Sequence, residues 1–289
     1  MNFDAFLEAA WNDHGDRSQE VADRLAASLA LVQSPEHIPP LARLVTHVFG
    51  EHLGQWRHGI ALLDAMRGLP ASDGAPATVG TLTRCAATLA YAGGDSSALE
   101  SLFTEDRAYV LAAATSILAA RNEFKRAIAA YTEALQLAQR GMPLESPAIR
   151  ALAVGGNNLA AALEEKKHRD SSETDAMIVA ANGGLTYWKL AGTWLEEERA
   201  EYRLARSLLQ AGEPHAALQS AGRCIDVCKL HDAPAFEQFF GYASLALAQR
   251  EAGDTPSFEQ SRKIALALFD QVPQDEKKWC KSAVSELGR

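Results

Sequence analysis

Short polar stretches rich in Gly, Pro, Asp and Ser interrupt this chain at regular intervals, and this rhythm constrains the fold more than any other feature. Examples are "AGGD", "AGEPH" and "AGDTPS". Between such stretches lie segments of roughly one to two dozen residues in which apolar side chains recur at spacings of three and four, the period of an amphipathic helix. The sequence therefore predicts a series of helical hairpins joined by short turns.

The residue composition agrees with a helical chain. Ala, Leu, Glu, Arg and Gln are abundant, whereas Val, Ile, Thr and aromatic residues are sparse, a balance that favours helix over strand. The 289 residues, 47% of them hydrophobic, can also supply a substantial core. We predict an all-α fold.

Several hairpins share one pattern of small and apolar residues. In "GEPHAALQSAGRCIDVC" the pattern is Ala217, Ala221 and Cys224, and the helix before it has the small residue Ala205 twelve positions before Ala217. The segments "NEFKRAIAAYTEALQLA", "DTPSFEQSRKIALAL" and "GQWRHGIALLDAM" repeat the spacing. Self-similarity of this kind indicates a repeat protein in which each hairpin buries its apolar face against its neighbours.

This pattern resembles the tetratricopeptide repeat family, over most of residues 36 to 272 and most closely from 107 to 266. The corresponding positions in successive second helices are separated by about 50, 40 and 41 residues rather than the family's 34. The family's Trp in the first helix and its terminal Pro are also missing. The resemblance implies a right-handed superhelix with a concave groove lined by the first helix of each hairpin.

We expect one superhelical domain over residues 1–289. Residues 1–35 would form N-terminal capping helices, residues 36–272 the repeats, and residues 273–289 a C-terminal capping helix with Trp279, Val284 and Leu287 turned inward. The register of the repeats is left open within residues 70–110 and 164–190.

The resemblance also implies a binding site on the groove. The stretch "NNLA" aligns Asn158 with the groove and Asn157 with its edge, and it is similar to the kinesin-light-chain type of repeat. One polar row on the next first helix contains Arg199, Arg203, Arg206 and Gln210, because these residues share a face at 100° per residue. The predicted protein-binding residues are Asn157, Asn158, Arg199, Tyr202, Arg203, Arg206, Gln210 and Phe240. The alternative is structural: the two asparagines satisfy polar groups between helices, and Arg199 pairs with Glu196 on a solvated face.

Charge and cysteine content limit the kinds of partner and compartment. The formal net charge of −9 disfavours nucleic acid and anionic membranes. No leader-like N-terminus and no long apolar segment are found, and four cysteines are too few for a disulfide framework. We expect a cytoplasmic protein whose partner is a protein or peptide with an acidic or carboxylate-bearing segment; homo-oligomerisation is left open.

Two groups of metal-ligand residue types are interpreted as structural. Cys224, Cys228 and His231 share a helical face but match no zinc finger, and Cys224 falls on a core position of the repeat. The histidines at 47, 52 and 58 do not form H-E-x-x-H, so they are expected to be isolated surface or packing residues. We expect no metal and no cofactor.

No motif for nucleotide binding or acyl transfer is present, and the carboxylates from Glu196 to Glu198 are expected to be exposed. The sequence therefore predicts a non-catalytic scaffold or adaptor that binds a protein or peptide. The alternative is a peptide or small-signal sensor, resembling bacterial regulators with tetratricopeptide grooves, that acts through a separate output partner.

Overall fold

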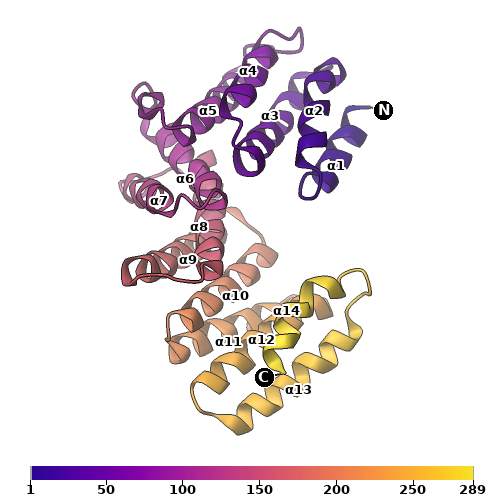
Figure 1. The fold of residues 1–289 in the computed structure, drawn as a ribbon, viewed down its shortest axis with the longest axis vertical. Helices are drawn as coiled ribbons and strands as arrows, with labels where there is room; N and C mark the ends of the chain where they lie inside the picture. The colour runs from indigo at the N-terminus through magenta and orange to yellow at the C-terminus, as the bar shows by residue number, and fades with distance from the viewer. Residues whose placement is uncertain (1, 289) are drawn as a thin grey trace. The chain divides into compact units, whose positions relative to one another are not determined.

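The computed structural model describes residues 2–288, and this part of the chain contains helices and no strand (Figure 1). The predicted all-α class is therefore confirmed. The α-helices are α1 (Phe3–Asp13), α2 (Ser18–Ser28), α3 (Ile38–His47), α4 (Trp56–Arg67), α5 (Pro76–Ala92), α6 (Thr104–Ala120), α7 (Phe124–Ala138), α8 (Pro147–Glu165), α9 (Ser171–Ala191), α10 (Trp194–Gln210), α11 (Pro214–Leu230), α12 (Ala235–Glu251), α13 (Thr255–Gln271) and α14 (Lys277–Leu287). Short helical turns are η1 (Leu29–Leu31), η2 (Pro35–His37), the π-helical η3 (Val48–Leu53) and η4 (Ser96–Leu99).

The chain divides into two compact units, Met1–Leu152 and Ala153–Arg289, with the boundary inside α8. In the first unit α4 packs on α5, α5 on α6 and α6 on α7. In the second unit each helix from α9 to α13 packs on the next one along the chain. This packing of sequence neighbours is consistent with an α-solenoid. This division does not test the expected single domain over residues 1–289, which stays a prediction.

Several hairpin turns share one hydrogen-bonding geometry. At the turn after α10, Gly212 has φ 77° and the N–H of Glu213 donates to the carbonyl of Leu208 at 2.9 Å. After α12, Gly253 has φ 80° and the N–H of Asp254 donates to the carbonyl of Gln249 at 2.9 Å. A glycine with positive φ followed by this bond to the last turn is the Schellman motif. The "AGE" and "AGD" stretches thus end one helix and reverse the chain.

The residues of the repeat pattern in α7, α10 and α11 lie in the core, whereas Arg262 at the matching position of α13 is half-buried. Ala205, Ala217, Ala221 and Cys224 are all 0% exposed. The corresponding residues of α7, which are Ala127, Tyr131 and Ala134, are also buried. The spacing that suggested repeats therefore marks the faces on which the helices pack.

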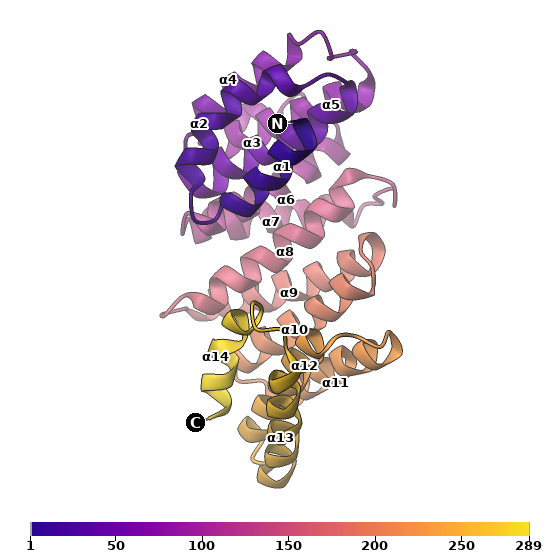
Figure 2. The same cartoon turned by 90° about the vertical axis from the view of Figure 1, so that its right-hand side faces the viewer.

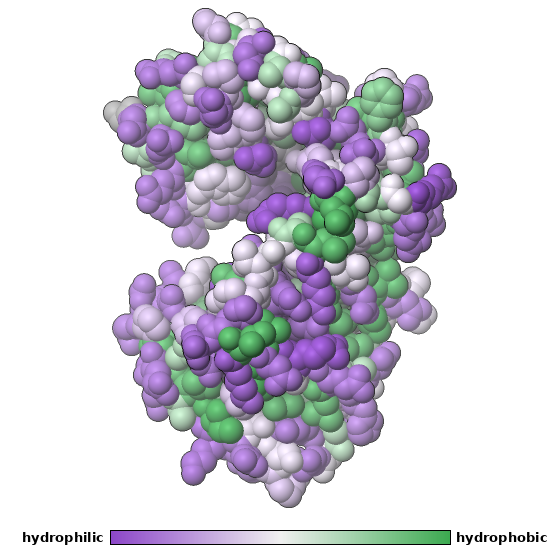
Figure 3. Space-filling view, turned by 180° about the vertical axis from the view of Figure 1, so that it is seen from behind, coloured by the Kyte–Doolittle hydropathy of each residue, from purple (hydrophilic) through white to green (hydrophobic). Residues whose placement is uncertain are grey.

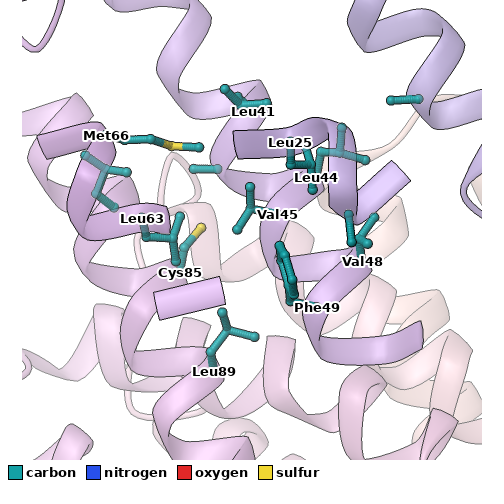
Figure 4. Close-up of a cluster of buried hydrophobic side chains, with 14 of the residues drawn as sticks. Leu25, Leu41, Leu44, Val45, Val48, Phe49, Leu63, Met66, Cys85 and Leu89 are labelled. Carbon is teal, nitrogen blue, oxygen red and sulfur yellow. The ribbon is translucent and has the colours of Figure 1, made fainter. Parts of the chain in front are cut away.

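The first unit has one large hydrophobic cluster, to which helices α1 to α6 contribute. Figure 4 shows part of it, with Leu44, Val45 and Val48 from α3 and η3 near Leu63 of α4 and Leu89 of α5. The N-terminal helices α1 and α2 bury Phe6 and Leu25 in the same cluster. Helices α1 to α6 thus share this core.

The C-terminal helix α14 packs against α12 and α13 (Figures 1 and 2). Leu287 is buried and Val284 packs against the local core, as predicted. The expectation for Trp279 is wrong, because its side chain is 67% exposed. The inward face of α14 carries Cys280, Ala283 and Leu287, and Trp279 lies one position before Cys280, away from the centre of this face.

Exposed apolar residues do not form a continuous stripe on the face shown in Figure 3, where hydrophilic residues predominate and apolar residues gather in small separate groups. Among the described residues, no helix combines the length and the hydropathy needed to cross a bilayer.

Candidate functional site

A cavity of about 230 Å³ lies among α8, α10 and α12 in the second unit. Its walls contain five of the eight predicted binding residues together with three others. The lining residues are Asn157, Glu198, Arg199, Tyr202, Arg203, Phe236, Glu237 and Phe240. Three helices that are not adjacent in the sequence thus bring together amide, guanidinium, carboxyl and aromatic groups.

Helix α10 supplies half of the lining because of how it begins and how its residues are spaced. Thr193 and Glu196 form a capping box, in which each side chain bonds to the other residue's backbone N–H, and this fixes the first turn. Arg199, Tyr202 and Arg203 follow at spacings of three and four and therefore share one face.

One wall of the cavity is aromatic. The rings of Tyr202 and Phe240 meet edge to face with centroids 5.4 Å apart, and Phe236 meets Phe240 in the same way at 5.1 Å. Edge-to-face contacts fix ring orientation and add stability beyond area burial. Burial also raises the pKa of Tyr202, so its hydroxyl stays protonated and can donate a hydrogen bond.

The arginines of the predicted row are paired with glutamates of the same unit. Arg199 donates through Nε and Nη2 to the carboxylate of Glu237, and Arg203 Nη1 donates to Glu164 Oε2 at 2.6 Å. The bond to Glu237 is the main reason why the pKa of Arg199 is raised. The hydrogen bonds of Arg199 therefore go to α12, while the charge of Glu196, its partner in the alternative interpretation, also raises its pKa.

Arg206 and Gln210 lie on a different cavity from the other predicted residues. Arg206 donates to both oxygens of Glu286, at 2.8 and 3.2 Å, and Gln210 accepts a bond from Arg169 at 3.0 Å. Both residues line an open cavity of about 530 Å³ with Arg250 and Glu286. The structure therefore divides the predicted polar row between two cavities.

The two adjacent asparagines of α8 are half-buried. Asn157 Nδ2 lies 3.4 Å from Asn158 Oδ1, and Asn157 also lines the smaller cavity. Gly184 of α9 lies so close to this turn that an added Cβ would be 3.0 Å from the backbone N of Asn157. The polar pair thus sits where two helices approach very closely, between a packing contact and a cavity.

Glu198 is the residue of this site that the sequence analysis assigned wrongly. It was expected to be exposed, but it is 1% exposed. Its pKa is raised to about 8: burial is the largest cause and the nearby Glu237 carboxylate adds to it, while the Cys224 hydrogen bond and the charge of Arg199 oppose the rise. Glu198 lies seven residues before Ala205 and therefore on the packed face of α10, a spacing that could have indicated its burial.

The cysteines of α11 lie next to this glutamate. Cys224 is buried as predicted, and its Sγ lies 3.0 Å from Glu198 Oε1. Its pKa is raised, first by a hydrogen bond with Cys228 and then by burial. The ligand-type atoms of Glu198, Cys224 and Cys228 lie within 4.8 Å of one another, whereas His231 stacks on Trp194. The third group beside the two thiols is therefore a glutamate and not the predicted histidine.

No model of a known protein family matches this chain, and no curated protein is similar to it in sequence. The resemblance to tetratricopeptide repeats therefore stays a prediction, and the function is inferred from the residues of the site.

Proposed function

We propose that this protein is a non-catalytic binding protein that holds a segment of a protein or peptide at the smaller cavity of the second unit. The observation that carries the proposal is the mixed lining of this cavity, with three aromatic rings beside Asn157 and Arg199. Binding sites for peptides typically combine aromatic anchors with a few placed hydrogen-bonding groups. A cavity of about 230 Å³ would accept one side chain of the segment.

The charged groups around the cavity suggest what kind of segment would bind. The side chain of Arg199 is 56% exposed, and its bonds to Glu237 use Nε and Nη2. A guanidinium has five N–H donors, so a carboxylate of the ligand can bind Arg199 without displacing Glu237. The segment that fits is one with an apolar or aromatic side chain next to an acidic residue or a free C-terminus.

Two buried polar atoms belong to residues that line the cavity. Nε of Arg203 and Oε2 of Glu198 have no hydrogen-bond partner within residues 2–288. Buried polar atoms are nearly always satisfied, and the exceptions often belong to functional sites. Both atoms are buried from solvent, so a ligand would bond to them only after the side chains around them moved.

A peptide library selected on the intact protein tests this function, with two matched variants. Arg199→Met removes the exposed arginine that pairs with the buried Glu237. The control, Arg223→Met on α11, removes an exposed arginine that pairs with the buried Glu201 of α10. We expect selected peptides with an apolar residue beside a carboxylate. Their affinity should fall about tenfold or more in Arg199→Met, since a charged hydrogen bond contributes about 1.5 to 3 kcal/mol, and should be retained in Arg223→Met.

The proposal would be overturned by a selection that yields no binding peptides. It would also be overturned by peptides that bind both variants equally, because the cavity would then not be their site. Melting curves of both variants show whether each retains its fold.

A further inference from the structure

The first unit contains a cluster of three histidines, which we infer to be a binding site for a divalent first-row metal ion such as Zn²⁺. His14 follows α1, His47 ends α3 and His52 lies in η3. One ring nitrogen of each lies within 4.8 Å of the others. The expectation of isolated histidines is thus wrong for His47 and His52, and His58 does not belong to the cluster.

The spacing of the ring nitrogens suits a metal. Nε2 of His47 lies 3.2 Å from Nε2 of His52. Two nitrogens bound to tetrahedral zinc at about 2.0 to 2.1 Å would lie about 3.3 to 3.4 Å apart. The two rings therefore already have the separation that a shared ion requires, and the ring of His14 is 4.8 Å from that of His47 and 5.2 Å from that of His52, centroid to centroid.

The other ring nitrogens of His47 and His14 have the partners that metal-binding histidines usually have. His47 Nδ1 lies 2.9 Å from a carboxylate oxygen of Glu51, and His14 Nδ1 lies 2.5 Å from the backbone carbonyl of Trp11. Each contact selects the tautomer in which Nδ1 carries the proton and Nε2 has a lone pair. A carboxylate or carbonyl on the outer nitrogen orients the ring and makes it a better ligand.

The π-helical segment η3 explains why His47 and His52 meet. Residues five apart in an α-helix lie about 140° apart around the axis and cannot face each other. A π-turn bonds residue i to i+5 and brings such residues together, and π-turns occur frequently at functional sites. Val48 and Phe49 of the same segment remain in the hydrophobic cluster shown in Figure 4. The π-turn thus keeps the core intact and aligns the two rings.

The exposure of the three rings also favours binding. The three histidines are half-buried, so an ion can reach them from solvent. Three imidazoles leave a fourth tetrahedral position for water, and imidazole suits Zn²⁺, Ni²⁺ and Cu²⁺.

Titration calorimetry with Zn²⁺ alone tests the site on the full-length protein, after chelation and removal of any affinity tag. We expect one ion per chain in the wild type. His14→Gln, His47→Gln and His52→Gln should each abolish this binding. Glu51→Gln should weaken it about 10- to 100-fold, as losses of such outer partners do. The matched control is His58→Gln, an exposed histidine on α4, which should bind as the wild type does.

Two further measurements keep the test decisive. Co²⁺ should give tetrahedral d–d absorption bands in the wild type, and these bands should be lost in His14→Gln. His14 lies just after α1 and outside the hydrophobic cluster, so this substitution should leave the core unchanged. Cys224→Ser removes the thiol next to Glu198 and should leave Zn²⁺ binding unchanged. The inference is wrong if the wild type binds no Zn²⁺, if binding survives in His14→Gln, or if Cys224→Ser abolishes it.

Discussion

At the scale of single residues, the ionisation of Glu198 distinguishes it from the other buried carboxylates of the second unit. Glu173 is paired with Lys166, Glu237 with Arg199, and Glu201 with Lys189 and Arg223. Glu198 instead accepts a bond from a neutral thiol, and its second oxygen has no partner within residues 2–288. The protonated form is favoured because burial and the nearby Glu237 carboxylate raise the pKa of Glu198 more than the Cys224 hydrogen bond and the charge of Arg199 lower it.

The raised pKa of Glu198 predicts how stability depends on pH. The unfolded chain loses this proton near the ordinary value of 4.5, whereas the native protein retains it up to about 8. Between these values the native state binds more protons, so the free energy of unfolding decreases as pH rises, by at most about 1.4 kcal/mol per pH unit. In Glu198→Gln this decrease should be absent.

Urea unfolding of wild type and Glu198→Gln across this pH range measures the difference. The control is Glu213→Gln, an exposed position of the same unit, which should follow the wild-type curve. Parallel curves for wild type and Glu198→Gln would show that the glutamate is ionised in the native state.

At the scale of helical elements, the close approach of α8 and α9 depends on Gly184. A Cβ there would meet only backbone atoms, with the N of Asn157 at 3.0 Å and the carbonyl oxygen of Ala153 at 3.4 Å. Backbone cannot rotate away as a side chain can, so the two helices would have to separate. Gly222 of α11 is also helical but has no atom within 4 Å of its hypothetical Cβ.

This contrast gives a paired prediction. Gly184→Ala should overpack the helix contact and lower the free energy of unfolding by about 1 to 3 kcal/mol. Gly222→Ala should raise it by about 0.5 to 1 kcal/mol, because alanine is the better helix former in open space. Thermal melting of both variants checks the pair. Equal effects of the two substitutions would contradict the close approach of α8 and α9.

At the scale of the whole molecule, the same kind of local contact recurs along the chain. Hairpin turns with a Schellman bond connect helices that then pack on their sequence neighbours within each unit. Such proteins are stabilised mainly by contacts between adjacent repeats. No described segment of the chain depends on strand pairing.

The far-ultraviolet circular dichroism spectrum should therefore be that of a helical protein, with a helix content near 79% and no strand component. A substantial strand contribution in the folded protein would contradict the helical architecture. The helical signal is also the readout by which the folding of every variant above can be verified.

The sequence by itself determined the helices, the turns and the core positions of the repeat pattern. This was so because amphipathic spacing and glycine turns act over a few residues, and Ala205, Ala217 and Cys224 are indeed buried. Tertiary structure decided the rest. The pairing of Arg199 with Glu237 and the meeting of His14 with His47 and His52 join residues far apart in the sequence. Burial of Glu198 likewise depends on helices packed around it, and only that packing removes the water that would keep a carboxylate ionised.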